Sequence, residues 1–174
     1  GWLTRANLFL VLIIASGFPT ACSSGSGGTT STSVVSPDIG SCSLGLSPIA
    51  GDEDTIAAML RAEGDYVTQQ DILALMRLWA EDGRVVDAKH TQDVLEDDQT
   101  WQGTDAIRHR YVRWVFPGAP AMAQPADLVI NMAGEEAVVT STTQIGDEVS
   151  PAGDRWRLVK SEGCWVIQEL VFNL

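Results

Sequence analysis

The sequence predicts an α+β domain in which one curved antiparallel sheet wraps around three N-terminal helices. Apolar residues recur at helical spacing in three segments between residues 52 and 118, whereas apolar and polar residues alternate in the segments after residue 126. Turns that contain glycine separate the alternating segments, which is typical of strands joined as hairpins. A chain of 174 residues, 45% of them apolar, can bury one ordinary core, so a single domain is expected.

The net charge of the chain limits the classes of molecule that it can be expected to bind. The net charge is −12, and phosphate contacts need clustered Lys and Arg, so we expect no nucleic-acid partner. The acidic stretch from Thr91 to Thr100, with His90 beside it, fits no metal-binding spacing and is expected to be a solvated loop. The run Gly25–Gly28 neither follows a strand nor opens a helix, so it is no phosphate loop. The sequence thus indicates no metal and no cofactor.

The first 21 residues have the pattern of a secretory signal. The apolar run Leu8–Ile14 follows Arg5 and is too short to cross a bilayer as a permanent helix. The stretch from Pro19 to Cys22 resembles a bacterial lipoprotein cleavage site, in which the cysteine becomes lipidated. We therefore expect an extracytoplasmic domain held at the membrane by a lipid on Cys22. An ordinary cleaved signal, which would release a secreted protein, and an uncleaved anchor helix are the alternatives.

Residues 22–51 are rich in Ser, Thr, Gly and Pro and are expected to form a flexible tether to the domain, residues 52–174. If Cys22 is lipidated, Cys42 and Cys164 remain as a pair in a compartment where disulfides persist. A bridge between them would pin the end of the tether to a late strand. The alternative is that Cys164 is merely a small buried apolar residue.

Two helices are expected at the start of the domain. Asp52 begins the first, with further acids in the first turn, where they favour the helix dipole. The second begins after Thr68 or at Asp71. The residues expected to face the core are Ile56, Met59, Leu60 and Val67 in the first helix and Ile72, Leu75, Met76 and Trp79 in the second.

A tight turn at Asp82-Gly83 is expected to lead from the second helix into a strand. Within that strand Val85 and Asp87 alternate and so point to one face. If this face is the interior, the Asp87 carboxylate lies in an apolar cavity, where a carboxylate is either paired or poised for proton chemistry.

A third helix is expected from Thr104 to the Pro117-Gly118 stop. Its inward positions are Ile107, Tyr111, Trp114 and Val115. Its outer face carries a basic island, expected to be solvated surface, that consists of Arg108, His109, Arg110 and Arg113.

The remaining segments alternate as strands over residues 126–132, 136–145, 154–160 and 164–173. Turns at Gly134, Gly153 and Gly163 separate them. Helices followed by such a meander predict one sheet that curls around a helix and encloses a pocket.

Three motifs resemble the nuclear-transport-factor-2-like (NTF2-like) superfamily, in its SnoaL-like and ketosteroid-isomerase-like branches. They are Trp79–Asp87, Gly103–Arg108, and Asp154-Arg155-Trp156 with the hairpin after it. The likeness extends over residues 52–174. It implies a cone-shaped, cystatin-like α+β barrel, a fold that hosts enzymes, binding modules and assembly subunits alike.

The resemblance also implies roles for two acids. In the isomerase branch an aspartate removes a proton next to a carbonyl, and a tyrosine with a protonated aspartate stabilises the oxyanion. Asp87 matches the base and Asp154 the second acid. The position of the tyrosine is taken by Glu63, with Tyr66 and Tyr111 as possible substitutes.

Simpler roles remain open for both acids. Asp87 would then bind a backbone amide or an arginine, and Asp154 would pair with Arg155 or Arg157.

Two functions follow from these observations. The preferred one is a domain without catalytic activity that binds a small apolar molecule or a protein partner, with a homodimer through the sheet face as a further expectation. The alternative is a cofactor-independent isomerase, lyase or hydrolase with Asp87 as general base. The side chains expected to line the ligand pocket are Val85, Trp101, Tyr66, Tyr111 and Trp156.

Overall fold

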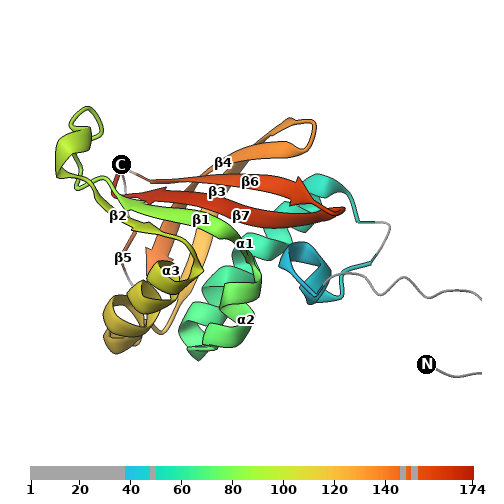
Figure 1. The fold of residues 1–174 in the computed structure, drawn as a ribbon, viewed down its shortest axis with the longest axis horizontal. Coiled ribbons are helices and arrows are strands. Elements are labelled where there is room, and N and C mark those ends of the chain that lie inside the picture. The colour runs from blue at the N-terminus through green and yellow to red at the C-terminus, as the bar shows by residue number, and fades with distance from the viewer. Residues whose placement is uncertain (1–37, 48–49, 146–147, 150–152) are drawn as a thin grey trace, which may run out of the picture. The chain divides into compact units, whose positions relative to one another are not determined.

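A curved sheet with helices on one of its faces forms the described part of the chain (Figure 1). The computed structural model describes residues 38–47, 50–145, 148–149 and 153–174. The expected signal segment and Cys22 lie outside these residues. Within the described residues, no helix is long and apolar enough to cross a membrane.

The helices form where the sequence pattern predicts them, but the second and third are shorter than predicted. The α-helices are α1 (Asp52–Gln69), α2 (Ile72–Arg77) and α3 (Thr104–Arg110). Three acids in the first turn of α1 lie at the positive end of its dipole. The helix ends where Gln70 adopts a left-handed φ of 57°. Asp71 caps α2 by accepting a hydrogen bond from the Ala74 amide at 3.0 Å.

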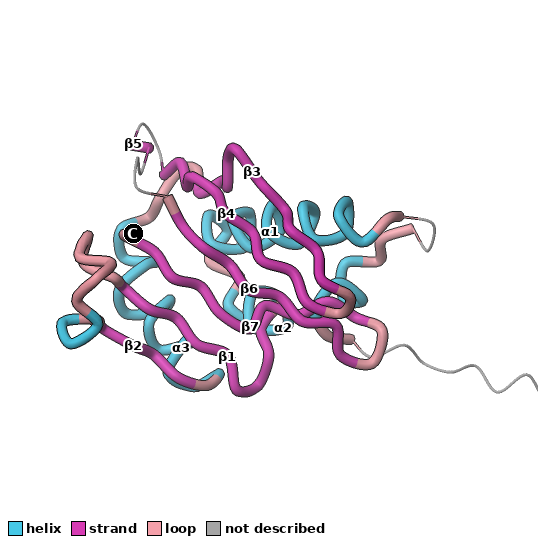
Figure 2. Tube along the Cα trace, turned by 90° about the horizontal axis from the view of Figure 1, so that it is seen from above, coloured by secondary structure: helices cyan, strands magenta, loops and turns pink. Residues whose placement is uncertain are grey.

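The sheet is mixed, with the strand order β2-β1-β7-β6-β4-β3 and with β5 paired to β4 (Figure 2). Its strands are β1 (Trp79–Asp87), β2 (Gln99–Gln102), β3 (Ala123–Ala133), β4 (Glu136–Ile145), β5 (Glu148–Val149), β6 (Asp154–Ser161) and β7 (Cys164–Phe172). The α+β class is confirmed. The expectation of a wholly antiparallel sheet is corrected in one pair, because β1 and β7 run parallel. A long connection between two strands permits that arrangement.

Strand β1 begins earlier than the sequence pattern predicts. Trp79, expected on the second helix, is its first residue, and it is buried. The expected turn at Asp82-Gly83 lies inside the strand, where the register with β7 shifts between Trp79 and Arg84. Such a bulge bends a strand and increases its twist. The tight turn is therefore replaced by a bend within the sheet.

The third helix changes its winding at Tyr111. After α3 the chain continues as a π-helical turn, Tyr111–Val115, and a 3₁₀ turn, Phe116–Gly118. The wider π turn shifts the following side chains around the axis relative to a 3.6-residue period. Tyr111, at the start of the turn, is buried as expected, but Trp114, also expected to point inward, is 70% exposed.

The core lies between the helices and the covered face of the sheet. It contains Ile56 and Leu60 of α1 with Val139, Leu158 and Ile167 of the central strands, all fully buried. Helix α1 lies in close contact with strand β3 at Gly64, where a Cβ would lie 1.7 Å from the Ala123 carbonyl oxygen. This contact holds Glu63, the neighbouring residue, beside the start of β3.

Part of the expected tether is packed on the sheet. Gly40–Leu44 form a 3₁₀ helix, and a disulfide joins Cys42 to Cys164 at the start of β7. The Ser41 hydroxyl accepts a hydrogen bond from the Trp165 amide at 2.9 Å. The ordered unit thus begins before Asp52, because the bridge and this hydrogen bond hold the preceding segment in place.

Candidate functional site

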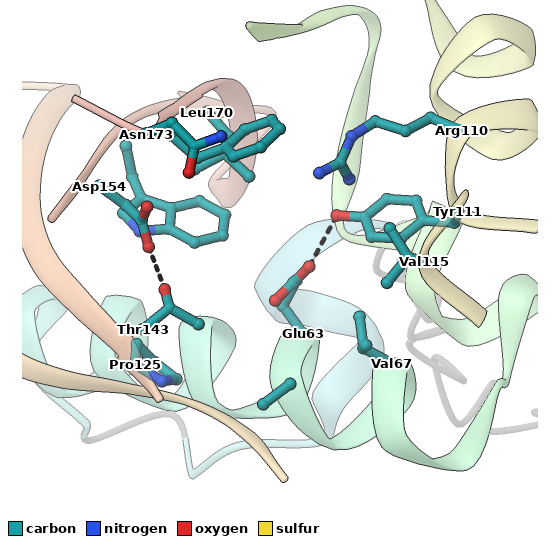
Figure 3. A pocket seen from close by; sticks show the side chains of 13 residues that line it. Glu63, Val67, Arg110, Tyr111, Val115, Pro125, Thr143, Asp154, Leu170 and Asn173 are labelled. Atoms are coloured by element: carbon teal, nitrogen blue, oxygen red, sulfur yellow. Dashed lines mark hydrogen bonds between the residues drawn. The ribbon is translucent and has the colours of Figure 1, made fainter. Parts of the chain in front are cut away.

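A cavity of about 240 Å³ lies between α1, the π-helical turn and the strands β3, β4, β6 and β7 (Figure 3). Its wall is mostly apolar, and four ionisable side chains converge on it: Glu63, Arg110, Tyr111 and Asp154. The apolar lining residues are Val67, Val115, Ala123, Pro125, Trp156, Leu170 and Phe172. Mostly apolar walls with a few convergent polar groups are typical of small-molecule sites.

Glu63 projects into the cavity from the apolar stripe of α1 and is 8% exposed. The Tyr111 hydroxyl donates a hydrogen bond to Glu63 Oε1 at 2.6 Å. Burial disfavours the charged carboxylate and raises the pKa of Glu63 to about 7, although the bond from Tyr111 and the charge of Arg110 oppose the shift. Glu63 therefore exchanges a proton near neutral pH.

Tyr111 follows the buried Ile107 by four residues and so lies on the same inward face. Its ring packs against Trp79 and Phe116, with centroid separations of 6.5 and 6.3 Å. Burial and the nearby Glu63 charge raise the pKa of Tyr111 well above its ordinary value. The phenol thus stays protonated and serves as a hydrogen-bond donor.

Asp154 enters from the start of β6, on the wall opposite Glu63 (Figure 3). It is 5% exposed and accepts a hydrogen bond from the Thr143 hydroxyl. Burial raises the pKa of Asp154, while the bond from Thr143 and the charge of Arg110 act in the opposite direction. The expected simpler pairing with Arg155 or Arg157 is absent among the described contacts of Asp154.

Arg110, the last residue of α3, points its guanidinium group toward the cavity above the Tyr111 hydroxyl (Figure 3). The guanidinium carbon lies 4.6 Å from the ring centre of Phe172 and 5.3 Å from those of Trp101 and Tyr111. Cations are attracted to the faces of such rings. The expectation that Arg110 belongs to solvated surface is therefore wrong, because three rings hold it at the cavity.

Asp87 does not line the cavity. Its carboxylate pairs with Lys89 Nζ at 2.7 Å and accepts hydrogen bonds from the Lys89 amide at 3.1 Å and from Asn173 Nδ2 at 2.7 Å. Burial raises the pKa of Asp87, but these partners outweigh it and leave the pKa below its ordinary value. The expectation that Asp87 faces the hollow is corrected: it is not a lining residue, although its hydrogen-bond partner Asn173 is one.

Two of the five side chains expected in the pocket, Tyr111 and Trp156, line it. Val85 is fully buried in the core, and Tyr66 packs against the edge of that core. Trp101 contributes indirectly, since its ring lies against Arg110. The structure thus brings together Asp154, Tyr111 and Trp156 and leaves Asp87, Val85 and Tyr66 outside.

Sequence reasoning missed Glu63 and Arg110 as cavity residues, although a signal existed for both. Glu63 stands three residues after Leu60 and four before Val67, so it interrupts an apolar helical stripe. Arg110 follows the buried Ile107 by three residues and so shares its face. A charged residue on the inward face of a helix is the pattern that would have identified them.

The ionisable groups of the cavity do not form a metal site. Among the residues that the structure describes, no group of three or more His, Cys, Asp or Glu side chains is arranged to hold an ion. Instead, the protonated forms of Glu63 and Asp154 can donate hydrogen bonds, and Arg110 supplies a positive charge. The arrangement suits a molecule that has an apolar body and one polar end.

Comparison with known proteins shows the fold. No protein-family model matches the sequence, and no curated protein matches it. An NTF2-like protein with a cystatin-like fold from Novosphingobium aromaticivorans matches with a TM-score of 0.55 and 17% identity, over 69% of this chain and 79% of that one.

Two proteins of unknown function give similar matches. One, from Nostoc punctiforme, has a TM-score of 0.51 and 14% identity over 70% of this chain and 90% of its own. The other, from Mycobacterium tuberculosis, has a TM-score of 0.50 and 18% identity over 67% of this chain and 71% of its own. The chain therefore has the cystatin-like fold of NTF2-like proteins, and its function has to be argued from its own cavity.

Proposed function

We propose that this domain binds a small, mostly apolar molecule with one polar end in the cavity between α1 and the sheet. The observation that carries the proposal is the convergence of four ionisable side chains on an otherwise apolar hollow. Small-molecule sites are typically apolar clefts with a few polar groups that orient the ligand, and this cavity has that composition.

The size of the cavity limits the ligand. A cavity of about 240 Å³ lies at the small end of ligand sites and has room for a short apolar tail with one polar end. Six-carbon chains with different polar ends are therefore suitable probes. We choose hexanoate, hexanamide and hexylammonium, which share a tail and differ in the charge of the polar end.

Blocking the cavity tests the proposal. Val115 lines the cavity from the π-helical turn, whereas Val112 on the same turn is 45% exposed and lies outside it. In methyl-detected NMR titrations, Val115→Trp should weaken binding of the best probe by about tenfold or more, because the indole fills the space of the tail. Val112→Trp is the matched control and should bind as the wild type does. Equal binding by both variants, or no binding of any probe to the wild type, would contradict the proposal.

A second candidate function is proton transfer, favoured by the pKa of about 7 at Glu63. In this reaction the Glu63 carboxylate removes a proton from a carbon next to a carbonyl. Asp154, in its protonated form, donates a hydrogen bond to the oxyanion that develops. Glu63 takes the place expected for Asp87, since Asp87 is outside the cavity.

Turnover of a panel of small enones and lactones tests this second candidate. Glu63→Gln should abolish any turnover that the wild type shows, because the amide cannot accept the proton. Asp87→Asn should leave turnover within about threefold of the wild type. Turnover that survives in Glu63→Gln would eliminate the mechanism.

We place this function outside the cytoplasm, on a lipid anchor at Cys22. The Cys42–Cys164 disulfide supports an oxidising compartment, and the apolar run Leu8–Ile14 supports export. The mature protein should then begin with a diacylated Cys22. A mass spectrum showing an unmodified Cys22 would refute the anchor without bearing on the cavity.

A further inference from the structure

The positive charge at the cavity has an unusual setting. Arg110 is half-buried and in contact with Trp101, Tyr111 and Phe172, all through ring faces. Among the described residues no carboxylate oxygen lies within 4 Å of its nitrogens. Aromatic rings attract the cation but accept no strong hydrogen bonds in the plane of the guanidinium group. The planar donors of Arg110 are therefore available to a ligand.

We propose that Arg110 binds the carboxylate of a small apolar acid, whose tail lies against Val67, Val115 and Leu170. This inference rests on the proposed binding function and names the chemical class of its ligand. The guanidinium group presents paired N–H donors that match the two oxygens of a carboxylate. The rings around it limit the motion of the Arg110 side chain, which lowers the entropic cost of binding.

The acidic side chains of the cavity are compatible with an anion. Asp154 and Glu63 both have a raised pKa because they are buried, so each can hold its proton and donate a hydrogen bond. Tyr111 keeps its proton and donates a hydrogen bond to Glu63 Oε1, which leaves the other oxygen of a protonated Glu63 to donate. A carboxylate beside Arg110 would raise the proton affinity of both acids further, since a like charge disfavours their ionised forms. The acids then act as donors, and the ligand carries the negative charge.

An apolar amine is the competing ligand class. Its ammonium group would bind the ionised forms of Glu63 and Asp154, but it would also approach the fixed charge of Arg110. Because guanidinium stays protonated at any pH at which the protein is folded, this repulsion is permanent, whereas the two acids can be neutralised. A carboxylate is therefore favoured over an ammonium group at the same site.

The three six-carbon probes test the inference. With methyl-detected NMR titrations at pH 7, wild-type protein should bind hexanoate about tenfold or more tightly than hexanamide, and hexylammonium most weakly. In Arg110→Met, which keeps an apolar stem against the rings, the preference for hexanoate over hexanamide should fall to within about twofold. Arg108→Met removes one charge from the exposed side of the same helix and should keep the wild-type preference.

The outcomes separate the two proposals. If hexanamide or hexylammonium binds as tightly as hexanoate, or if Arg110→Met keeps the wild-type preference, the carboxylate inference is wrong and the binding function stands. If none of the three probes binds to the wild type, both fail.

Discussion

Glu63 determines how the domain should respond to pH. Its pKa in the folded protein is about 7, above its ordinary value of 4.5. Between these two values the folded chain holds a proton that the unfolded chain has lost, so its stability falls as the pH rises. Asp154 acts in the same direction. Asp52 and Asp87 have lowered pKa values, and their effect is confined to more acidic pH.

Replacing Glu63 by glutamine should remove most of this pH dependence. The wild type should lose about 3 kcal/mol of unfolding free energy between pH 4.5 and pH 7 through this group. Glu63→Gln keeps an acceptor for the Tyr111 hydroxyl but cannot ionise, so its unfolding free energy should change much less over that range. Urea unfolding at several pH values measures both.

Glu96→Gln serves as control, since Glu96 is exposed in the loop after β1, and it should retain the pH dependence of the wild type. A pH profile of Glu63→Gln that matches the wild type would show that Glu63 does not carry a raised pKa.

At the residue scale, the sequence was a good guide to which acidic residues are candidates for the site. It was a poorer guide to the direction in which their side chains point. Asp154 was identified from its place at the start of a strand pair, and it lines the cavity. Asp87 is expected at the cavity from its alternation with Val85 and from its resemblance to a catalytic base, yet the Lys89 amide and ammonium group bind its carboxylate outside the cavity. Lys89, the residue that binds this carboxylate, has a left-handed φ of 53°. Strand alternation does not contain that information.

Among the elements, helix α1 is positioned by its contact with β3. The Ala123 carbonyl oxygen lies where a side chain on Gly64 would begin, so the helix can approach the strand only because residue 64 is glycine. Gly64→Ala should therefore lower the unfolding free energy by about 1–3 kcal/mol, as overpacking of a tight contact does. Urea unfolding measures the change.

The control for this contact is Gly118→Ala, in the 3₁₀ turn after the π-helical turn, where no atom lies within 4 Å of an added Cβ. Its unfolding free energy should stay within about 0.5 kcal/mol of the wild type. If both variants are equally stable, the close approach of α1 to β3 is not what holds Glu63 at the cavity.

The π-helical turn shows why the inward face of the third helix was only partly predicted. A 3.6-residue period correctly places Ile107 and Tyr111 inside. The i→i+5 hydrogen bonds of the turn then shift the face, and Trp114 becomes exposed while Val115 still reaches the cavity. The segment Val112–Val115 is mostly apolar, as are the residues directly before and after it. The sequence therefore does not indicate where the helix changes from α-helical to π-helical hydrogen bonding.

At the scale of the whole molecule, the pattern of helices followed by alternating strands was sufficient to predict the fold. The parallel pairing of β1 with β7 was not predictable in this way, because it joins segments 85 or more residues apart and leaves no local signal. That pairing brings the C-terminal Phe172 and Asn173 to the cavity. The site therefore depends on contacts between distant parts of the chain, whereas the elements depend on local patterns.

The central claim is that the hollow between α1 and the sheet receives the apolar tail of a small ligand. Intermolecular NOEs between the tightest-binding six-carbon probe and the protein methyl groups test this claim most directly. The account predicts NOEs from the tail to Val67, Val115 and Leu170, which line the cavity. NOEs confined to Val129 and Val138, which are 56% and 40% exposed on the outer face of the sheet, would contradict it.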